Sequence, residues 1–515
     1  MLVKSYAAAV QGISATVVTV EVNCSKGIQF FLVGLPDVAV RESHERIISA
    51  LQVCGYKFPR NRIVINMAPA DIRKEGSSYD LPLAIGILAA AEQIDSSNLS
   101  KFVLMGELSM DGSLQPIKGA LPIAIKAREE GFKGFILPKQ NACEAAVVND
   151  LEVYGASNIK EVLEFMEGKP TLRPTVIDTR KEFYDRQQLF DCDFSDVRGQ
   201  ENVKRAMEVA AAGGHNLIMV GPPGSGKSML AKRLPTILPP FTLHESLETT
   251  KIHSVAGKIG GGTSLMVQRP FRSPHHTISN VAMVGGGTFP QPGEISLAHN
   301  GVLFLDELPE FNRSVLEVMR QPLEDRVINI SRARFTVEYP AGFMLVASMN
   351  PCPCGYYGHP SGKCRCSHKQ VANYLSKISG PMLDRFDLHI EVAPVEFSDI
   401  SSDKKEESSA EIRKRVSSAR DIQNERFKGT GITCNAKITP DRLNGFCPMD
   451  DKAKAFIGMA FDRLGLSARA YDRLLKVART ISDLNGCEKI EKEHISAAIQ
   501  FRSLDRKYWS GEEQK

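Results

Sequence analysis

The chain has 515 residues, and at about 150 residues per domain this length predicts roughly three domains. Hydrophobic residues make up 43% of the sequence and charged residues 24%, values that are typical of globular proteins and exclude wholesale disorder. The formal net charge of +4 neither requires nor forbids a polyanionic partner, so any basic surface must be local. Four of the eleven cysteines cluster between residues 352 and 366, a pattern that favours an intracellular metal site over a secreted disulfide framework.

The first 167 residues alternate short apolar strands with helical stretches, which predicts an α/β domain. The expected strands include 16–22, 63–66 and 134–137, and the expected helices are 43–54, 81–91 and 120–130. The apolar run at 81–91 is about half the length needed to span a bilayer, so it indicates a buried helix. No signal peptide is recognisable near the first residues, and we expect a cytoplasmic protein without membrane contact.

The rest of the chain divides into a linker and two further domains. Residues 168–195 are polar and aperiodic, which predicts a linker over the surface. Residues 196–395 again alternate strands and helices and predict a second α/β domain. Residues 396–515 begin with a charged connector and then show mainly helical periodicity, which predicts an all-helical lid.

A phosphate-binding loop opens the second domain. The apolar strand NLIMV is followed by GPPGSGKS and then by a helix, which is the strand-loop-helix context that the G-x-x-x-x-G-K-[ST] motif requires. Lys227 is expected to meet the β- and γ-phosphates of ATP, and Ser228 to ligate Mg²⁺. The predicted nucleotide-binding residues are Gly221, Pro222, Pro223, Gly224, Ser225, Gly226, Lys227, Ser228 and Met229.

Polar side chains follow two later strands of this domain. The strand at 301–305 ends in Asp306 and Glu307, where a parallel sheet presents its ligand-binding edge. We expect Asp306 to hold Mg²⁺ and Glu307 to polarise the water that attacks the γ-phosphate. The strand at 343–348 ends at Asn350, a candidate for holding that water. Further on, Arg385 lies between two aspartates, for which an internal salt bridge is the ordinary explanation.

The motifs GPPGSGKS, VLFLDELPEF, VASMNPCPCG, SGPMLDRFDL and SARAYDRLLKVARTI, read in order, resemble AAA+ ATPases of the magnesium-chelatase type. The resemblance is strongest to the ComM (YifB) family and covers nearly the whole chain. It implies a ring, usually a homo-hexamer, in which Arg385 is a finger that completes the neighbouring subunit's site. It also implies that Arg469 is a second sensor for the γ-phosphate. Because Arg473 and Arg479 share roughly the helical face of Arg469, a solvated arginine stripe is the alternative.

A basic region lies between the phosphate loop and the strand that ends in Asp306. Residues 251–293 contain no acidic residue and resemble the helix-2 insert of this AAA+ branch, and residues 327–339 resemble the hairpin before the first sensor. In related helicases these elements point into the ring channel, so the resemblance implies contacts with a DNA backbone. The alternative is a mobile loop with scattered charge. The candidates are Arg269, Arg272, His275, His276, Arg332 and Arg334.

The first domain resembles the proteolytic domain of Lon-type proteases in KEGSSYDLPLAIGIL and in GELSMDGSLQPIKGALPIAIKAREEGFKGFILP. The resemblance places Ser78 at the nucleophile position, but it places Ile123 where the activating lysine is expected. A serine without a base is a poor nucleophile. We therefore expect the Lon-like fold without proteolysis, with Ser78 in a polar turn or at a helix start.

Cys352, Cys354, Cys364 and Cys366 follow Asn350 closely, as two C-x-C pairs on one glycine-rich loop. Four thiolates in this arrangement suit a structural, tetrahedral Zn²⁺ site. His359 or His368 is a candidate to replace one ligand. The alternative is four reduced cysteines without a metal.

The combined prediction is an ATP-hydrolysing ring motor that acts on DNA. The family resemblance implies branch migration on single-stranded and branched DNA, extending the joint that incoming single-stranded DNA forms during natural transformation. One alternative is a chelatase-like motor, and another is an ATPase that remodels a protein partner without DNA translocation.

Overall fold

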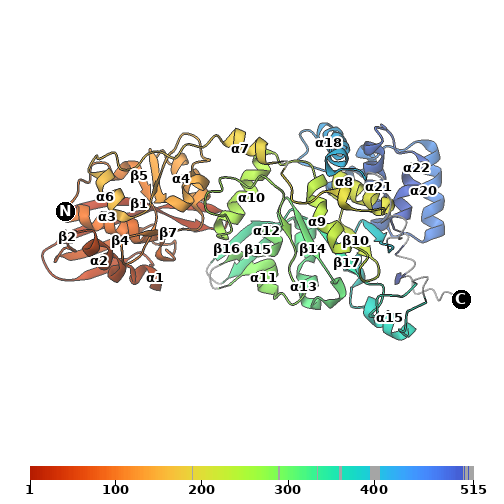
Figure 1. Ribbon diagram of the computed structural model, residues 1–515, viewed down its shortest axis with the longest axis horizontal. Coiled ribbons are helices and arrows are strands. Elements are labelled where there is room, and N and C mark those ends of the chain that lie inside the picture. Colours follow the sequence, from red (N-terminus) through yellow and green to blue (C-terminus); the bar gives the residue numbers. More distant parts are fainter. Residues whose placement is uncertain are drawn as a thin grey trace.

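The computed structural model arranges the chain as successive regions along its long axis, with the N-terminal region at one end and a helical region at the other (Figure 1). It describes residues 1–187, 189–287, 290–332, 335–358, 362–394, 406–502, 504 and 508–509. The order of the regions, two α/β regions followed by helices, confirms the predicted fold class.

The N-terminal region is built on a seven-stranded mixed sheet in the order β3-β4-β2-β1-β5-β8-β9. The antiparallel pairs β1–β2 and β2–β4 lie on one side of the sheet, and β5, β8 and β9 continue it as parallel strands. The strands are β1 (Leu2–Gln11), β2 (Ser14–Ser25), β3 (Phe30–Val33), β4 (Arg62–Ala68), β5 (Phe102–Leu104), β8 (Gly134–Pro138) and β9 (Glu152–Ala156).

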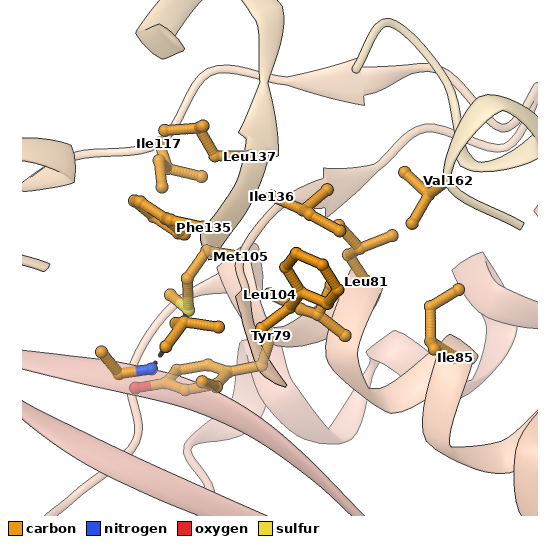
Figure 2. Packing of buried hydrophobic residues seen from close by; sticks show 14 of the residues in the cluster. Tyr79, Leu81, Ile85, Leu104, Met105, Ile117, Phe135, Ile136, Leu137 and Val162 are labelled. Atoms are coloured by element: carbon orange, nitrogen blue, oxygen red, sulfur yellow. Dashed lines mark hydrogen bonds between the residues drawn. The ribbon is translucent and has the colours of Figure 1, made fainter. Parts of the chain in front are cut away.

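Helices cover this sheet and bury its apolar side chains. All residues of α3 are buried, as expected for an apolar run of this length, and its side chains join those of β5 and β8 in one core, shown in Figure 2. The principal helices of the region are α2 (Ser43–Val53), α3 (Asp80–Ala90), α4 (Ala120–Glu129) and α6 (Ile159–Met166).

The second region contains a five-stranded parallel sheet in the order β11-β14-β17-β10-β18. Every residue of β10, β14 and β17 is buried, because helices cover both faces of a parallel sheet. Since all five strands run in one direction, the residues that follow them meet at one edge. The strands are β10 (Leu217–Val220), β11 (Phe271–Arg272), β14 (Val302–Leu305), β17 (Met344–Met349) and β18 (Leu388–Glu391).

Other elements of this region surround the sheet. The predicted hairpin is present as the antiparallel pair β15 (Val327–Arg332) and β16 (Phe335–Pro340). The main helices are α8 (Glu201–Gly213), α9 (Lys227–Ile237), α10 (Leu243–Val255), α13 (Arg313–Val318), α14 (Arg320–Asp325) and α15 (His368–Leu375).

The C-terminal region is helical, and its buried face joins the core beneath the parallel sheet. Helix α21 contributes Leu474, Val477 and Ala478 to this shared core. The helices are α18 (Ser409–Arg426), α20 (Asp451–Leu464), α21 (Ala468–Leu484) and α22 (Lys492–Gln500). Among the residues described, no helix has the length and apolar character needed to cross a membrane.

The N-terminal region packs directly on the second region, a contact that the sequence did not reveal. The backbone N–H of Gly119, at the start of α4, donates to the carbonyl of Ser254 in α10 (3.1 Å). A side chain at Gly12, in the turn between β1 and β2, would lie 2.9 Å from Val337 of β16. The N-terminal region therefore touches both α10 and the hairpin.

Candidate nucleotide-binding site

The phosphate loop joins β10 to α9 and depends on glycine at specific positions. Gly224 and Gly226 have φ angles of +77° and +87°, in the left-handed region that glycine adopts without strain. A side chain at Gly221 would lie 2.4 Å from the carbonyl oxygen of Val392. Pro222 and Pro223 complete the turn, and Met229 follows in the first turn of α9.

Lys227 is the first residue of α9, and its ammonium group turns back into the loop. The Nζ atom donates to the carbonyl oxygens of Gly221 (2.8 Å) and Pro222 (2.9 Å) and to Oδ1 of Asn350 (3.3 Å). Burial lowers the pKa of Lys227, and the charges of Asp306 and Glu307 oppose that shift. A buried cation that is held mainly by neutral acceptors is strongly stabilised when a negatively charged ligand binds to it.

Ser228 and Asp306 form the direct contact between the phosphate loop and β14. The Ser228 hydroxyl donates to Oδ2 of Asp306 (2.6 Å), and the Ser348 hydroxyl, from β17, donates to Oδ1. A hydroxyl and a carboxylate oxygen at this distance are ligands that Mg²⁺ takes beside bound phosphates. The role of Ser348 was missed in the sequence, although its place two residues before Asn350 was available as a signal.

Glu307 has fewer fixed partners than Asp306. Its φ angle of +55° is unusual for a residue other than glycine, and its side chain is 58% exposed. One carboxylate oxygen lies 3.7 Å from Nδ1 of His276, a residue that follows β11. The Glu307 carboxylate is therefore free to interact with a ligand at the sheet edge.

The loop has spare hydrogen-bonding capacity for the phosphates of ATP. The Ser225 hydroxyl is buried and has no partner among the described residues. This buried hydroxyl, the ammonium group of Lys227 and the Ser228–Asp306 pair are the groups that a nucleoside triphosphate with Mg²⁺ requires. The residues present therefore fit that ligand.

The arginine predicted as a finger is largely buried in the same region and is held by its own chain. Arg385 is 9% exposed and donates to Glu324 of α14 and to the carbonyl oxygen of Pro381 (3.4 Å). Its Nε atom has no partner among the described residues. Arg385 is therefore not in contact with the phosphate loop of its own chain.

Arg469 lies at the start of α21 and is exposed. The alternative of a solvated stripe with Arg473 and Arg479 is wrong, because Arg479 is buried and Arg473 is half-buried. Arg479 is 1% exposed and pairs with Asp483 at 2.8 Å, and Nε of Arg473 lies 3.8 Å from Asp387. Helical spacing alone did not reveal these partners.

The four clustered cysteines face one another beside the phosphate loop. The Sγ distances are 3.3 Å for Cys352–Cys354, 3.8 Å for Cys352–Cys364 and 3.6 Å for Cys354–Cys364, and Cys366 completes the group. A side chain at Gly355 would lie 2.4 Å from the ring of Pro223, so this loop and the phosphate loop are in close contact. His359 lies outside the described residues, and His368 is not part of the group.

Two of the arginines predicted to contact DNA already have partners within the chain. Arg269 donates to three backbone carbonyls and to Glu245, and its guanidinium lies over the ring of Phe241. Arg272 forms a two-pronged ion pair with Glu294 at 2.6 and 2.7 Å. Both partners are distant in sequence, so composition could not indicate them.

The other predicted contacts divide into two groups. His275 is exposed and His276 is half-buried, both in the loop after β11. Arg334 and the side chain of Arg332 lie outside the described part of the chain.

The fold and the site together define a phosphate-loop protein of the magnesium-chelatase type within the AAA+ class, with a Lon-like region before it. Three family models match in the same order as the structural regions. "Subunit ChlI of Mg-chelatase" matches residues 20–141, "Magnesium chelatase, subunit ChlI" matches 193–400, and "Magnesium chelatase, subunit ChlI C-terminal" matches 406–502.

Similar proteins extend along almost all of the chain. The chain is 44% identical over 506 residues to Competence protein ComM of Haemophilus influenzae, covering 97% of both chains, and 44% identical over 499 residues to YifB of Escherichia coli, covering 96% of both. Over 145 residues it is 30% identical to Lon protease 2 of Bacillus subtilis, a stretch of 27% of this chain and 25% of that one. The chain belongs to the ComM/YifB family.

Proposed function

We propose that the chain hydrolyses ATP with bound Mg²⁺ at the edge of its parallel sheet. The observation that carries this proposal is the meeting of Lys227, Ser228, Asp306 and Asn350, from three adjacent strands and their loops, within hydrogen-bonding distance. When bound, Mg²⁺ neutralises charge that develops on the β- and γ-phosphates. Glu307 orients the attacking water, and Asn350, whose Oδ1 accepts a hydrogen bond from Lys227, helps to hold that water.

The site is proposed to be completed by a neighbouring copy in a ring, which we expect to be a hexamer. In support, Arg385 contacts Glu324 instead of its own phosphate loop, and its buried Nε lacks a partner among the described residues. A guanidinium suits the charge of a phosphoryl-transfer transition state. Arg469, exposed on the lid, is proposed as the second sensor.

Mixed subunits test the shared site. Lys227→Ala and Arg385→Ala chains, each inactive alone, are expected to recover ATPase activity when mixed, because a Lys227→Ala neighbour supplies an intact Arg385. If no mixture is more active than the sum of its parts, the shared site is refuted.

We further propose that hydrolysis drives branch migration on DNA, promoting integration of incoming single-stranded DNA in natural transformation. The support is the name of the Haemophilus relative, a competence protein, and the hairpin β15–β16. The buried side chains of Ile328, Ile330 and Tyr339 fix the described part of this hairpin to the core. Of the predicted basic contacts, His275, His276, Arg332 and Arg334 are proposed first, because Arg269 and Arg272 are paired with Glu245 and Glu294.

A three-strand junction assay tests this activity. Wild-type chain with ATP is expected to extend the joint, and Glu307→Gln, which binds ATP without hydrolysing it, is expected not to. Joint extension at equal rates by both would refute the proposal. A chelatase-like motor is the second candidate, because all three matching models carry that name. Such a motor, like a protein-remodelling ATPase, is expected to hydrolyse ATP at the same rate with and without DNA.

The cysteine group is proposed to hold a structural Zn²⁺. Four thiolates at about 2.3 Å from a tetrahedral zinc lie about 3.8 Å from one another, close to the spacing found here. The contact between Gly355 and Pro223 means that such a site braces the phosphate loop.

We propose that the Lon-like region is not a protease. Ser78 is half-buried, and its hydroxyl makes no hydrogen bond among the described residues, whereas the neighbouring Ser77 hydroxyl donates to Glu107. Ile123, at the position expected for the lysine, is buried in the core. No general base therefore adjoins Ser78 in this part of the chain.

A further inference from the structure

The Lon-like region and the second region exchange apolar side chains across their interface. Phe241, between α9 and α10, and Leu265, in the loop after α10, are buried in the core of the Lon-like region. In the opposite direction, Ile13 of the Lon-like region packs against the core of the second region. Because each region contributes to the core of the other, the contact resists movement of one region relative to the other.

Ile13 lies at the tip of a long antiparallel hairpin. Strand β1 pairs with β2 along its whole length, and the last pair, Gln11 with Ser14, leaves a two-residue turn of Gly12 and Ile13. Gly12 has a φ angle of +61°, which tight turns of this kind require of a residue and which glycine adopts without strain. The paired strands therefore hold Ile13 in a fixed place at the end of the Lon-like region.

The turn lies against the hairpin that we propose to contact DNA. A side chain at Gly12 would lie 2.9 Å from Cγ1 of Val337 and 3.6 Å from the carbonyl oxygen of Glu338, both in β16. Val337 is half-buried, and it lies on the same face of β16 as the buried Tyr339 but two residues further from the base of the hairpin. The second region thus covers this face at the base of the hairpin, and the turn of the Lon-like region meets it further out.

We propose that the Lon-like region is a brace for the hairpin β15–β16, with Ile13 as a positioning residue, and that this brace holds the hairpin in the direction needed to contact DNA. A region without proteolytic chemistry then has a function in the motor. The inference rests on the proposed function, because it assigns a support to the proposed DNA-contacting element.

Hydrogen–deuterium exchange of the full-length wild type and Ile13→Ala tests the brace in the absence of DNA. Truncation removes the packing of Ile13 against the second region, so peptides from β15 and β16 are expected to exchange at least about fivefold faster. Peptides from α3 are expected to exchange at the wild-type rate, which shows that the Lon-like core remains folded. Ile13→Leu keeps an apolar side chain of equal size and is expected to protect the hairpin as the wild type does.

Fluorescence anisotropy with labelled single-stranded oligodeoxythymidylate, Mg²⁺ and a non-hydrolysable ATP analogue tests the consequence for DNA. Ile13→Ala is expected to raise the Kd for this DNA about five- to tenfold, because the hairpin loses part of its support. Basal ATP hydrolysis is expected to stay within about twofold of wild type, since Ile13 is not part of the nucleotide-binding site. The matched control is Ile48→Ala, another half-buried isoleucine, on α2 and away from the hairpin (Figure 1), which is expected to change neither measurement.

The outcomes distinguish this inference from the proposed function. Equal exchange of β15 and β16 in Ile13→Ala and wild type overturns the brace. Faster exchange with an unchanged DNA affinity overturns its role in DNA contact. A wild-type chain that does not bind the oligonucleotide refutes the proposed DNA function, while the exchange rates still decide whether Ile13 braces the hairpin.

Discussion

Asp387 connects the parallel sheet with the helical lid, and its replacement is expected to destabilise both together. Its carboxylate accepts hydrogen bonds from His215 (3.2 Å) and from the backbone N–H of Asn216 (3.2 Å), and Nε of Arg473 in α21 lies at 3.8 Å. Burial alone raises the pKa of Asp387. The hydrogen bond and charge of His215, with the charges of Arg473 and Lys476, outweigh burial and lower this pKa to about 2.

The size of the effect follows from the difference between the two pKa values. Relative to the usual 3.8, a pKa of about 2 corresponds to about 2.5 kcal/mol of stabilisation, at about 1.4 kcal/mol for each pH unit. Because the folded-state pKa is the lower one, this stabilisation is complete above about pH 4 and is lost as the pH falls towards 2. We therefore expect Asp387→Asn to lower the free energy of unfolding by about 2.5 kcal/mol at pH 7.

The chain carries its own probe for this measurement. Its single tryptophan, Trp509, lies 6.0 Å from the ring of His389 in β18, so its fluorescence reports on this part of the sheet during urea unfolding. Asp384→Asn, a half-buried aspartate in the same motif, is the matched control and is expected to change stability by less than about 0.5 kcal/mol. An equally small effect of Asp387→Asn would refute the reasoning. A difference that already shrinks between pH 7 and pH 5 would place the titrating group elsewhere.

Three further predictions concern the cysteine loop and the Lon-like region. Purified without chelators, the wild-type chain is expected to contain about one zinc per chain and Cys354→Ser less than about 0.2 by elemental analysis, whereas metal-free wild type contradicts the zinc site. Gly355→Ala, with φ +83° and a Cβ 2.4 Å from Pro223, is expected to weaken ATP binding at least about tenfold in a fluorescence titration. Gly362→Ala, where nothing lies within 4 Å of the added atom, is its control, and equal affinities in both variants would argue against the bracing contact. Ser78→Ala is expected to leave ATPase activity unchanged, and casein cleavage by wild type that this variant abolishes would overturn the non-proteolytic assignment.

The parts of the fold and the site that could be predicted were those carried by local sequence. The strands before Lys227 and Asp306 are short, fully apolar runs, and a parallel sheet buries such runs on both faces. Once two of these strands end in phosphate-binding and acidic residues, the common direction of the strands brings those residues to one edge. The contact between Ser228 and Asp306 is the direct result.

The parts that could not be predicted depend on partners far apart in the chain. Arg269 is largely buried because it pairs with Glu245, 24 residues earlier in the chain. No local sequence pattern indicates that pairing. The same holds for His276, whose partner Glu307 is reached only because β11 and β14 are neighbours. The packing of Gly119 against Ser254 likewise joins two regions that sequence patterns treat separately.

The central claim, that this sheet edge hydrolyses ATP, is tested most directly by comparing Mg²⁺-dependent ATPase activity of the wild-type chain with that of Glu307→Gln. The account predicts a loss of at least about 100-fold in kcat, as for removal of a group that acts in the transition state, with ATP affinity changed less than about threefold. A Glu307→Gln chain that keeps wild-type kcat, or a wild-type chain without Mg²⁺-dependent hydrolysis, would contradict it.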